Sequence, residues 1–411
     1  MMLRVLRLLT AGESHGQALV GILDGMPAGL PLAPEEIDLQ LRRRQGGHGR
    51  GGRMKIEKDR VQLLSGVRHG LTLGSPIGLL IPNRDWANWT GRMGVEPPEQ
   101  PVEAVTRLRP GHADLPGALK YGHQDVRNVL ERASARETAA RVALAAIART
   151  LLGHFGIELR SETVAIGGVA AEVPGWVGTD RRGAWGERAE RYWEAVEASP
   201  VRCGDPAAGE AMVQAIDEAR RAGDTLGGVF QVVVYGVPAG LGSHVQWDRK
   251  LSARLGEALM SINSVKGFEV GAGFGGAVLR GSGFHDVIRH DPEEGWVRQG
   301  NNAGGIEGGT SNGEPFVVRC AAKPIPTLMQ PLPSVDLVTK RPVAAAIERS
   351  DVCVVPAAGV VGEAMVALVL ADAFLEKFGG DSVEEIDRNY RGYLAASGRS
   401  PGSPPTECLS E

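Results

Sequence analysis

The chain has 411 residues, of which 43% are hydrophobic and 23% are charged, a composition typical of a soluble globular protein with one large domain or two smaller ones. Its formal net charge of -4 excludes a global basic surface, and its aromatic content of 5% disfavours a stacking platform for single-stranded nucleic acid. The four cysteines are far apart and form no C-x-x-C pair, which disfavours a metal or disulfide framework and favours the reducing cytoplasm. Arg149 and Asp372 interrupt the longest apolar stretches, so we expect no membrane partner.

The hydrophobic patterning predicts a mixed α/β protein. Apolar and β-branched runs predict strands at residues 3–9, 61–67, 76–81 and 229–237. Apolar residues at steps of three and four predict helices at 133–156, 248–262 and 362–380, with Asp248 as the cap of the second helix and two glycines after the third. The charged, Trp-rich stretch 175–200 is expected to be a helical surface excursion, and a buried strand is expected after Asp351, before a Pro-Gly turn.

No fixed-period repeat and no linker divides the chain. We therefore expect a single large domain over residues 1–393. The Pro/Ser/Gly-rich tail at 394–411 is expected to be disordered.

The stretch TAGESHG, residues 10–16, combines a carboxylate, a hydroxyl and an imidazole between glycines. Taken alone it fits an ordinary turn, in which Ser14 caps a helix, as well as it fits a catalytic site. An imidazole beside an acid, as in Glu13 and His15, suits proton transfer near neutral pH.

The densest basic feature is residues 41–57, which hold five arginines among five glycines. Guanidinium groups bind carboxylates and phosphates through paired hydrogen bonds, and glycine lets them crowd around one anion. A solvated charged face and an RNA-binding Arg/Gly segment are the alternatives. A small, multiply charged anion suits a short and singular cluster best, and Arg44 and Arg50 are its candidate ligands.

A second basic patch covers residues 107–138. Arg109 and His112 lie in a Pro-Gly turn together with Asp114. Ser134 and Glu137 match the S-x-x-E capping box where a helix is predicted to begin, and Arg136 nearby would make that helix start a cradle for an anion.

Glycine clusters mark two further stretches. VGAGFGG, residues 270–276, lacks the spacing of a dinucleotide-binding loop. NNAGGIEGGTSNG, residues 301–313, contains too many glycines for a helix or central strand and suits a flat ligand. Farther along, Arg349 and Asp351 form either an isolated ion pair or part of a site.

Six motifs occur in one order between residue 5 and about residue 380: GESHG, SARETAARVA, SINSVKG, NNAGGIEGGTSNG, KPIPTL and RSDVCVVPAAGVVGEAM. Together they resemble the motif set of the chorismate synthase family. The resemblance implies an α/β (α+β) fold, a single β-α-β sandwich with helices packed between antiparallel sheets, and a homotetramer. It also implies a lyase of the shikimate pathway that eliminates phosphate from 5-enolpyruvylshikimate 3-phosphate in an anti-1,4 sense to give chorismate.

The resemblance implies reduced FMN as the cofactor, without net redox change, and no metal. It leaves open whether NADPH or an external flavin reductase reduces the FMN. A flavin reductase and an Arg/Gly-mediated nucleic-acid-binding protein are the alternative functions; the low aromatic content and negative charge argue against the latter.

Residue roles follow from matching the motifs. His15, His112 and Asp351 resemble the catalytic groups, the histidines moving protons and the acid tuning the flavin. Arg44, Arg50, Arg109 and Arg136 are expected to hold the phosphate of the substrate or of NADP. The expected FMN contacts are Arg132, Ala133, Ser134, Asn263, Ser264, Gly308, Lys323, Pro324, Ile325, Pro326, Thr327 and Arg349. Ala133 stands where many relatives have serine, and KPIPTL differs from the more usual KPTSS, which makes Ile325 and Pro326 backbone contacts at most.

Overall fold

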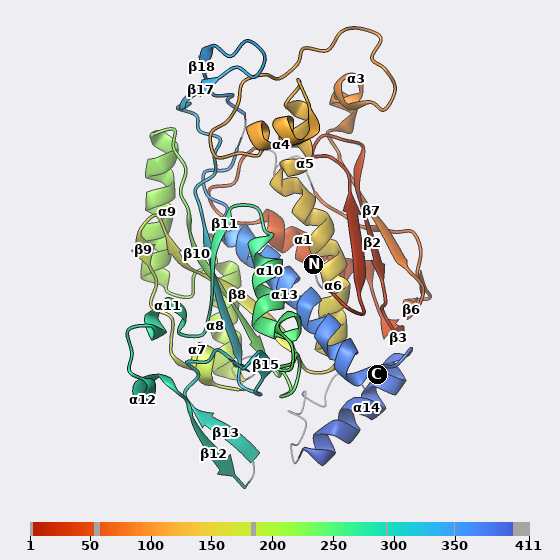
Figure 1. Ribbon diagram of the computed structural model, residues 1–411, viewed down its shortest axis with the longest axis vertical. Helices are drawn as coiled ribbons and strands as arrows, with labels where there is room; N and C mark the ends of the chain where they lie inside the picture. The colour runs from red at the N-terminus through yellow and green to blue at the C-terminus, as the bar shows by residue number, and fades with distance from the viewer. Residues whose placement is uncertain (1–2, 53–57, 182–185, 293–294, 349, 398–411) are drawn as a thin grey trace.

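The computed structural model describes residues 3–52, 58–181, 186–292, 295–348 and 350–397. Two antiparallel sheets enclose a layer of helices (Figure 1). The first sheet has the order β1 (Arg7–Ala11), β2 (Ala18–Asp24), β7 (Ile77–Pro82), β4 (Gln62–Leu63). The second has the order β11 (Val265–Val270), β16 (Phe316–Ala322), β10 (Gly228–Tyr235), β8 (Glu158–Ile166), β9 (Val169–Ala170). The expected β-α-β sandwich is confirmed.

The helix layer consists mainly of α6 (Thr138–His154) and α13 (Val355–Phe378), which pack on each other and each on one sheet. The helices α1 (Pro34–Gln45) and α10 (Leu251–Met260) flank α13. The close approach of α13 to its sheet requires glycine, because a Cβ on Gly362 would lie 2.5 Å from Cε2 of Phe230. Within the described ranges, α13 is the one helix apolar and long enough to span a membrane, and that stretch is wholly buried, as expected of a core helix.

Smaller elements surround the sandwich. Three further helices are α8 (Glu187–Ala198), α9 (Pro206–Arg221) and α14 (Val383–Ala396), and a three-stranded sheet has the order β3 (Ala28–Pro31), β6 (Leu71–Leu73), β5 (Val67–Arg68). Hairpins are formed by β12 (Val287–Asp291) with β13 (Gly295–Gln299), β14 (Ile306–Glu307) with β15 (Thr310–Ser311), and β17 (Pro333–Val335) with β18 (Pro342–Ala344). Short helices are η1 (Trp86–Asn88), α3 (Thr90–Met93), α4 (Asp114–Tyr121), α5 (Arg127–Ala133), η2 (Ala135–Glu137), α7 (Trp176–Thr179), η3 (Trp247–Arg249), α11 (Gly273–Gly276) and α12 (Gly281–Phe284).

The predicted strands at 76–81 and 229–237 are confirmed as β7 and β10, whereas the predicted strand at 3–9 forms later, as β1, and the one at 61–67 is divided between β4 and β5. The stretch 175–200 is helical in α7 and α8, but α8 is more than an excursion. Its Trp193 and Val196 are buried against Val233 and Tyr235 of β10, so it covers the outer face of the second sheet.

Of the two predicted caps, Asp248 is wrong and Ser134 is confirmed in part. Asp248 lies in η3, before the N-terminal flank of α10 at Lys250, and its carboxylate accepts a hydrogen bond from Nη2 of Arg4 at 2.9 Å. Ser134 caps the 3₁₀ turn η2, which leads directly into α6: its Oγ accepts from the Arg136 amide at 3.3 Å, so a cap at the start of this helical segment is confirmed. The carboxylate of Glu137 accepts from Arg141 at 3.0 Å. Glu137 is the last residue of η2, and its side chain therefore serves an i,i+4 pair with Arg141 in the first turn of α6.

The region after Asp351 also differs from expectation. No strand forms there; Cys353 makes an isolated bridge with Leu226, and α13 begins at Val355 with Pro356 in its first turn. Proline is favoured at that position because its fixed φ suits the helix and its missing N–H would have no helical partner. At the other end, α14 continues to Ala396, so the first residues of the expected tail are helical. Residues 398–411 lie outside the described residues, and their disorder stays a prediction.

Candidate active site

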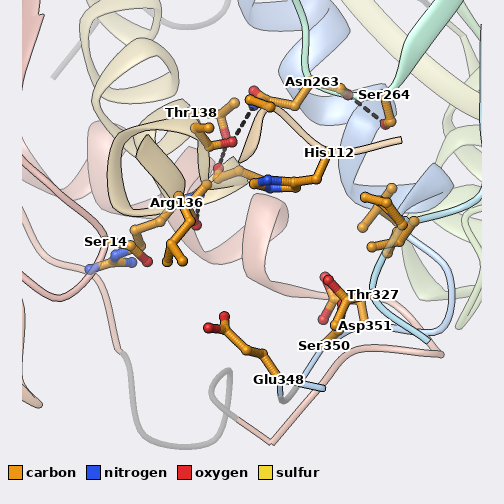
Figure 2. Close-up of a pocket in the computed structure, with 18 of the residues that line it drawn as sticks. Ser14, His112, Arg136, Thr138, Asn263, Ser264, Thr327, Glu348, Ser350 and Asp351 are labelled. Carbon is orange, nitrogen blue, oxygen red and sulfur yellow. Dashed lines mark hydrogen bonds between the residues drawn. The ribbon is translucent and has the colours of Figure 1, made fainter. Parts of the chain in front are cut away.

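A cavity of about 840 Å³ lies where the N-terminal ends of α6 and α13 meet loops from across the chain. Thr138 of α6 and Ala357 and Ala358 of α13 form part of its wall. Figure 2 shows Thr138, Asn263 and His112 along one side in this view and Thr327, Asp351 and Glu348 along the other. Helix N-termini carry unpaired N–H groups and a positive dipole end, so this placement favours a negatively charged ligand.

Most of the predicted site residues are brought together here. The cavity is lined by His15, Arg44, Arg50, Arg109, His112, Ala133, Ser134, Arg136, Asn263, Ser264, Lys323, Ile325, Pro326, Thr327 and Asp351. These residues come from segments far apart in the sequence, so their convergence is a property of the tertiary structure.

Four predicted cofactor contacts are not among them. The Arg132 guanidinium donates to the carbonyl oxygens of Gly12 and Thr10, each at 3.0 Å, and so joins α5 to the end of β1. Gly308 lies in the turn between β14 and β15, where an added Cβ would lie 3.7 Å from Cβ of His244, and Pro324 packs on Gly227. Arg349 lies outside the described residues. A contact of these four with a cofactor stays a prediction.

His15 is held by an acid distant in sequence. Its Nδ1 lies 2.9 Å from Oε2 of Glu131, and its backbone N–H donates to the same oxygen at 2.9 Å. The expected neighbour, Glu13, is exposed. Burial would raise the pKa of Glu131, but the hydrogen bonds and charge of His15, together with Arg127, outweigh burial and lower it. A carboxylate that accepts from Nδ1–H leaves Nε2 as the acceptor of the neutral ring.

His112 is held by the acid that the sequence indicated. Its Nδ1 lies 2.5 Å from Oδ1 of Asp114. Asp114 also accepts from Nε of Arg109 at 2.9 Å and from Nη2 at 3.0 Å. Burial alone would raise the pKa of Asp114, but hydrogen bonds from His112 and Arg109 lower it well below its usual range. The main partner of Arg109 is thus Asp114, so this arginine helps to orient the pair of Asp114 with His112 at the cavity wall.

Two buried arginines share one carboxylate. Nη1 of Arg136 lies 2.5 Å from Oδ1 of Asp59, and Nη1 of Arg44 lies 3.8 Å from Oδ2 of Asp59. Nε of Arg44 donates to Oγ1 of Thr138 at 2.9 Å. Burial, despite the opposing charge of Asp59, lowers the pKa of Arg44, and the guanidiniums of Arg136 and Arg50 add to this. A guanidinium nevertheless keeps its proton, so the cluster carries excess positive charge at the cavity wall.

Arg50 and Asp351 pair directly. Nη1 of Arg50 lies 2.9 Å from Oδ2 of Asp351, whose Oδ1 accepts from the amide of Gly51 at 2.6 Å. The loop after α1 is thereby joined to the segment before α13. Arg43 is engaged elsewhere, with Glu197 and Glu363, so in the described part of residues 41–57 the cluster does not form a uniformly solvated Arg/Gly face. This arrangement disfavours the nucleic-acid-binding alternative.

A third wall combines backbone and amide groups. Asn263 donates through Nδ2 to the carbonyl of Ala133 at 3.1 Å, and Ser264 adopts a left-handed φ of 70°. A left-handed conformation is unfavourable for serine, and such strain often occurs at ligand sites. Lys323 donates through Nζ to the carbonyl of Gly111, next to His112. The predicted cofactor segments at 133–134, 263–264 and 323–327 therefore border one space.

Two orphaned polar atoms test whether this space fits a flavin and an anion. Asn263 Oδ1 and Arg44 Nη1 are two of several buried side-chain atoms without a hydrogen-bond partner in the described residues, and both belong to side chains that line this cavity. Leaving a buried polar group unsatisfied costs about 1–3 kcal/mol. An N–H group of a flavin ring could donate to Asn263 Oδ1, and a phosphate or carboxylate oxygen could accept from Arg44 Nη1. The donor and acceptor set therefore fits both kinds of group.

Sequence reasoning missed three residues that define the site: Glu131, Asp59 and Trp89. Glu131 and Trp89 line the cavity, and Asp59 lies behind Arg44 and Arg136. Glu131 lies 116 residues from His15, and no local spacing links the two. No helix was predicted over Glu131, and its local signal is a carboxylate that directly follows the apolar Val129 and Leu130, with which it is buried in α5.

Comparisons with known proteins agree with the motif resemblance. The sequence profile of the family described as chorismate synthase matches residues 6–375. A chorismate synthase from Pelobacter propionicus is 57% identical over 397 residues, which cover 95% of this chain and 98% of that protein. One from Moorella thermoacetica is 58% identical over 394 residues, which cover 95% and 99%. A solved structure described as a crystal structure of chorismate synthase matches with a TM-score of 0.76 and 44% identity, covering 96% of this chain and 99% of that one. This chain therefore belongs to the chorismate synthase family of lyases.

Proposed function

We propose that the cavity catalyses the anti-1,4 elimination of phosphate from 5-enolpyruvylshikimate 3-phosphate, giving chorismate. The proposal rests on one observation: several arginines and two histidines, each histidine paired with a carboxylate, line the same cavity. The substrate carries a phosphate and two carboxylates, so it needs several cationic ligands. It also loses a proton from carbon as phosphate leaves, so it needs groups that handle protons.

Reduced FMN is the proposed cofactor. Ala133, Ser134, Asn263 and Ser264, with residues 323–327, would hold it, and Asn263 Oδ1 supplies an acceptor for a ring N–H. When bound by these residues, reduced flavin would supply transient electron density to the allylic system of the substrate, without net redox change.

The anion ligands are Arg44, Arg50 and Arg136. Their guanidiniums lie at the cavity wall, and Asp59 and Asp351 hold them in place. A bound phosphate or carboxylate compensates the excess positive charge, so substrate binding is favoured electrostatically. Because Asp351 accepts from Arg50 and from Gly51, it holds the loop after α1 in place and keeps a negative charge at the wall of the cavity.

The two histidines hold or move protons at Nε2. Glu131 and Asp114 each accept from a ring Nδ1, which selects one tautomer and one ring orientation. Each Nε2 can then accept a proton and give it back. General acid–base groups of this kind contribute rate factors of about 10²–10⁴.

An anaerobic assay with chemically reduced FMN tests the function. With purified protein and 5-enolpyruvylshikimate 3-phosphate, chorismate followed by its absorbance should accumulate over many turnovers for each flavin. Oxidised FMN alone should support none. Flavin oxidation in proportion to product, or full activity with oxidised FMN, would contradict the proposal.

Further properties are proposed on family membership. We infer that residues 1–393 act as one catalytic domain, and that the protein works in the cytoplasm as a homotetramer, without nucleic acid or membrane. Adding NADPH and oxidised FMN anaerobically tests the source of electrons: chorismate formation without another protein would assign flavin reduction to this chain, and none would assign it to an external reductase. Sedimentation of the purified protein tests the tetramer.

A further inference from the structure

Trp89 stacks on His15, although no motif in the sequence connects the two. The ring centroids are 3.8 Å apart and the planes differ by 21°. Trp89 lies between η1 and α3, and it lines the same cavity as His15. This contact is independent of the Glu131 hydrogen bond, which reaches the edge of the imidazole.

The two contacts restrain different motions of the ring. A hydrogen bond at Nδ1 fixes one edge of an imidazole but still allows the ring to pivot about that bond. A flat neighbour against the ring face opposes the pivot. An aromatic side chain suits this purpose because it presents a large, rigid surface and loses little conformational entropy when it is held.

Trp89 is itself held firmly. Its Nε1–H donates to Oδ2 of Asp85 at 2.9 Å. The guanidinium carbons of Arg127 and Arg92 lie 5.4 Å and 5.8 Å from the centre of its ring, within the range of cation–π attraction. Arg127 also donates to Oε1 of Glu131 at 3.0 Å. The same arginine therefore supports both the edge partner and the face partner of His15.

We infer that Trp89 is a positioning residue for His15, which keeps Nε2 of the imidazole in one direction relative to the cavity. The inference rests on the proposed function, because it takes His15 to be a proton-transfer group. Removal of the indole should therefore reduce turnover by letting the imidazole pivot. Substrate affinity should change little, since the anion ligands are elsewhere.

A double-mutant cycle tests this role. Trp89→Leu should lower kcat by about tenfold, a moderate loss for misorientation of a reacting group, with KM within about twofold of wild type. In a His15→Ala background the same substitution should cost nothing further, because Trp89 acts through His15. Trp86→Leu removes an indole from η1, three residues earlier in the chain, and is the matched control, with kcat unchanged. An equal loss in both backgrounds would overturn the inference.

A structural readout separates this inference from the proposed function. In protein with isotope-labelled histidine, the ring signals assigned with His15→Ala should be shifted upfield by the stacked indole. The shift should be reduced in Trp89→Phe, which keeps a smaller ring and should retain most of kcat. Absence of the shift in the wild type would overturn the positioning role. Absence of chorismate from the wild type, with the shift present, would overturn the proposed function alone.

Discussion

Replacement of Asp114 by asparagine should reduce both turnover and stability. Asp114 is fully buried at the start of α4 and accepts four hydrogen bonds: from Nδ1 of His112 at 2.5 Å, from Nε and Nη2 of Arg109 at 2.9 Å and 3.0 Å, and from the Arg109 amide at 3.0 Å. Asparagine keeps the shape of the side chain but removes its charge. Its NH₂ group would face N–H donors of Arg109 or His112 at a position where a carboxylate oxygen accepts hydrogen bonds in the wild type. His112 would then lose the partner that selects its tautomer.

The size of the effect follows from these contacts. Removal of one partner from a buried ion pair costs about 3–5 kcal/mol, and Arg109 is 7% exposed. Oε2 of Glu348 lies 3.6 Å from Nη1 of Arg109, so this second carboxylate offsets part of the loss and favours the lower end of that energy range. With an unfolding entropy of about 2.1 cal/mol/K per residue over 411 residues, Tm should fall by about 3–6 °C. Turnover should fall by about 10²–10⁴ if His112 transfers a proton.

Anaerobic turnover with reduced FMN and a calorimetric Tm measure the two effects separately. Asp387→Asn is the matched control, because Asp387 forms an i,i+4 pair with Arg391 on the outer helix α14 and should change neither quantity measurably. A lower Tm with wild-type turnover would show that Asp114 is structural only. An unchanged Tm would refute the ion-pair argument itself.

Four further predictions concern the same framework. His15→Ala and His112→Ala should each lower kcat by about 10²–10⁴, and wild-type rates in both would remove them from the mechanism. Arg50→Lys keeps the charge but loses the planar fork, so KM for substrate should rise; an equal KM would show that a point charge suffices. Asp351→Asn should lower turnover while flavin titration still detects FMN binding, and undiminished turnover would count against its role. Burial would raise the pKa of Glu363, but the charges of three surrounding arginines hold it far below its usual range. The stability it contributes is therefore present above the unfolded-state pKa of about 4.3 and lost as pH falls below it, so the acid-induced drop in Tm should be smaller in Glu363→Gln than in wild type.

The sequence alone was sufficient where structure depends on neighbours along the chain. The apolar runs at 76–81 and 229–237 predicted β7 and β10, because the residues of a strand that are buried show as an alternating or continuous apolar pattern within that short stretch of sequence. His112 and Asp114 are two residues apart, so their pairing could be expected from the turn that contains them. The order of six motifs likewise indicated the family, which the comparisons confirm.

Tertiary structure alone decided which charges from distant parts of the chain meet. His15 pairs with Glu131 and not with the adjacent Glu13, because packing of α5 buries Glu131 beside the loop while Glu13 faces solvent. Asp351 pairs with Arg50 and accepts from Gly51, which is 300 residues away in sequence. These contacts form only when the loop after α1 lies against the segment before α13. An ion pair or ring stack between distant segments leaves no periodic signature, because its free energy depends on burial and geometry that only the assembled sandwich supplies.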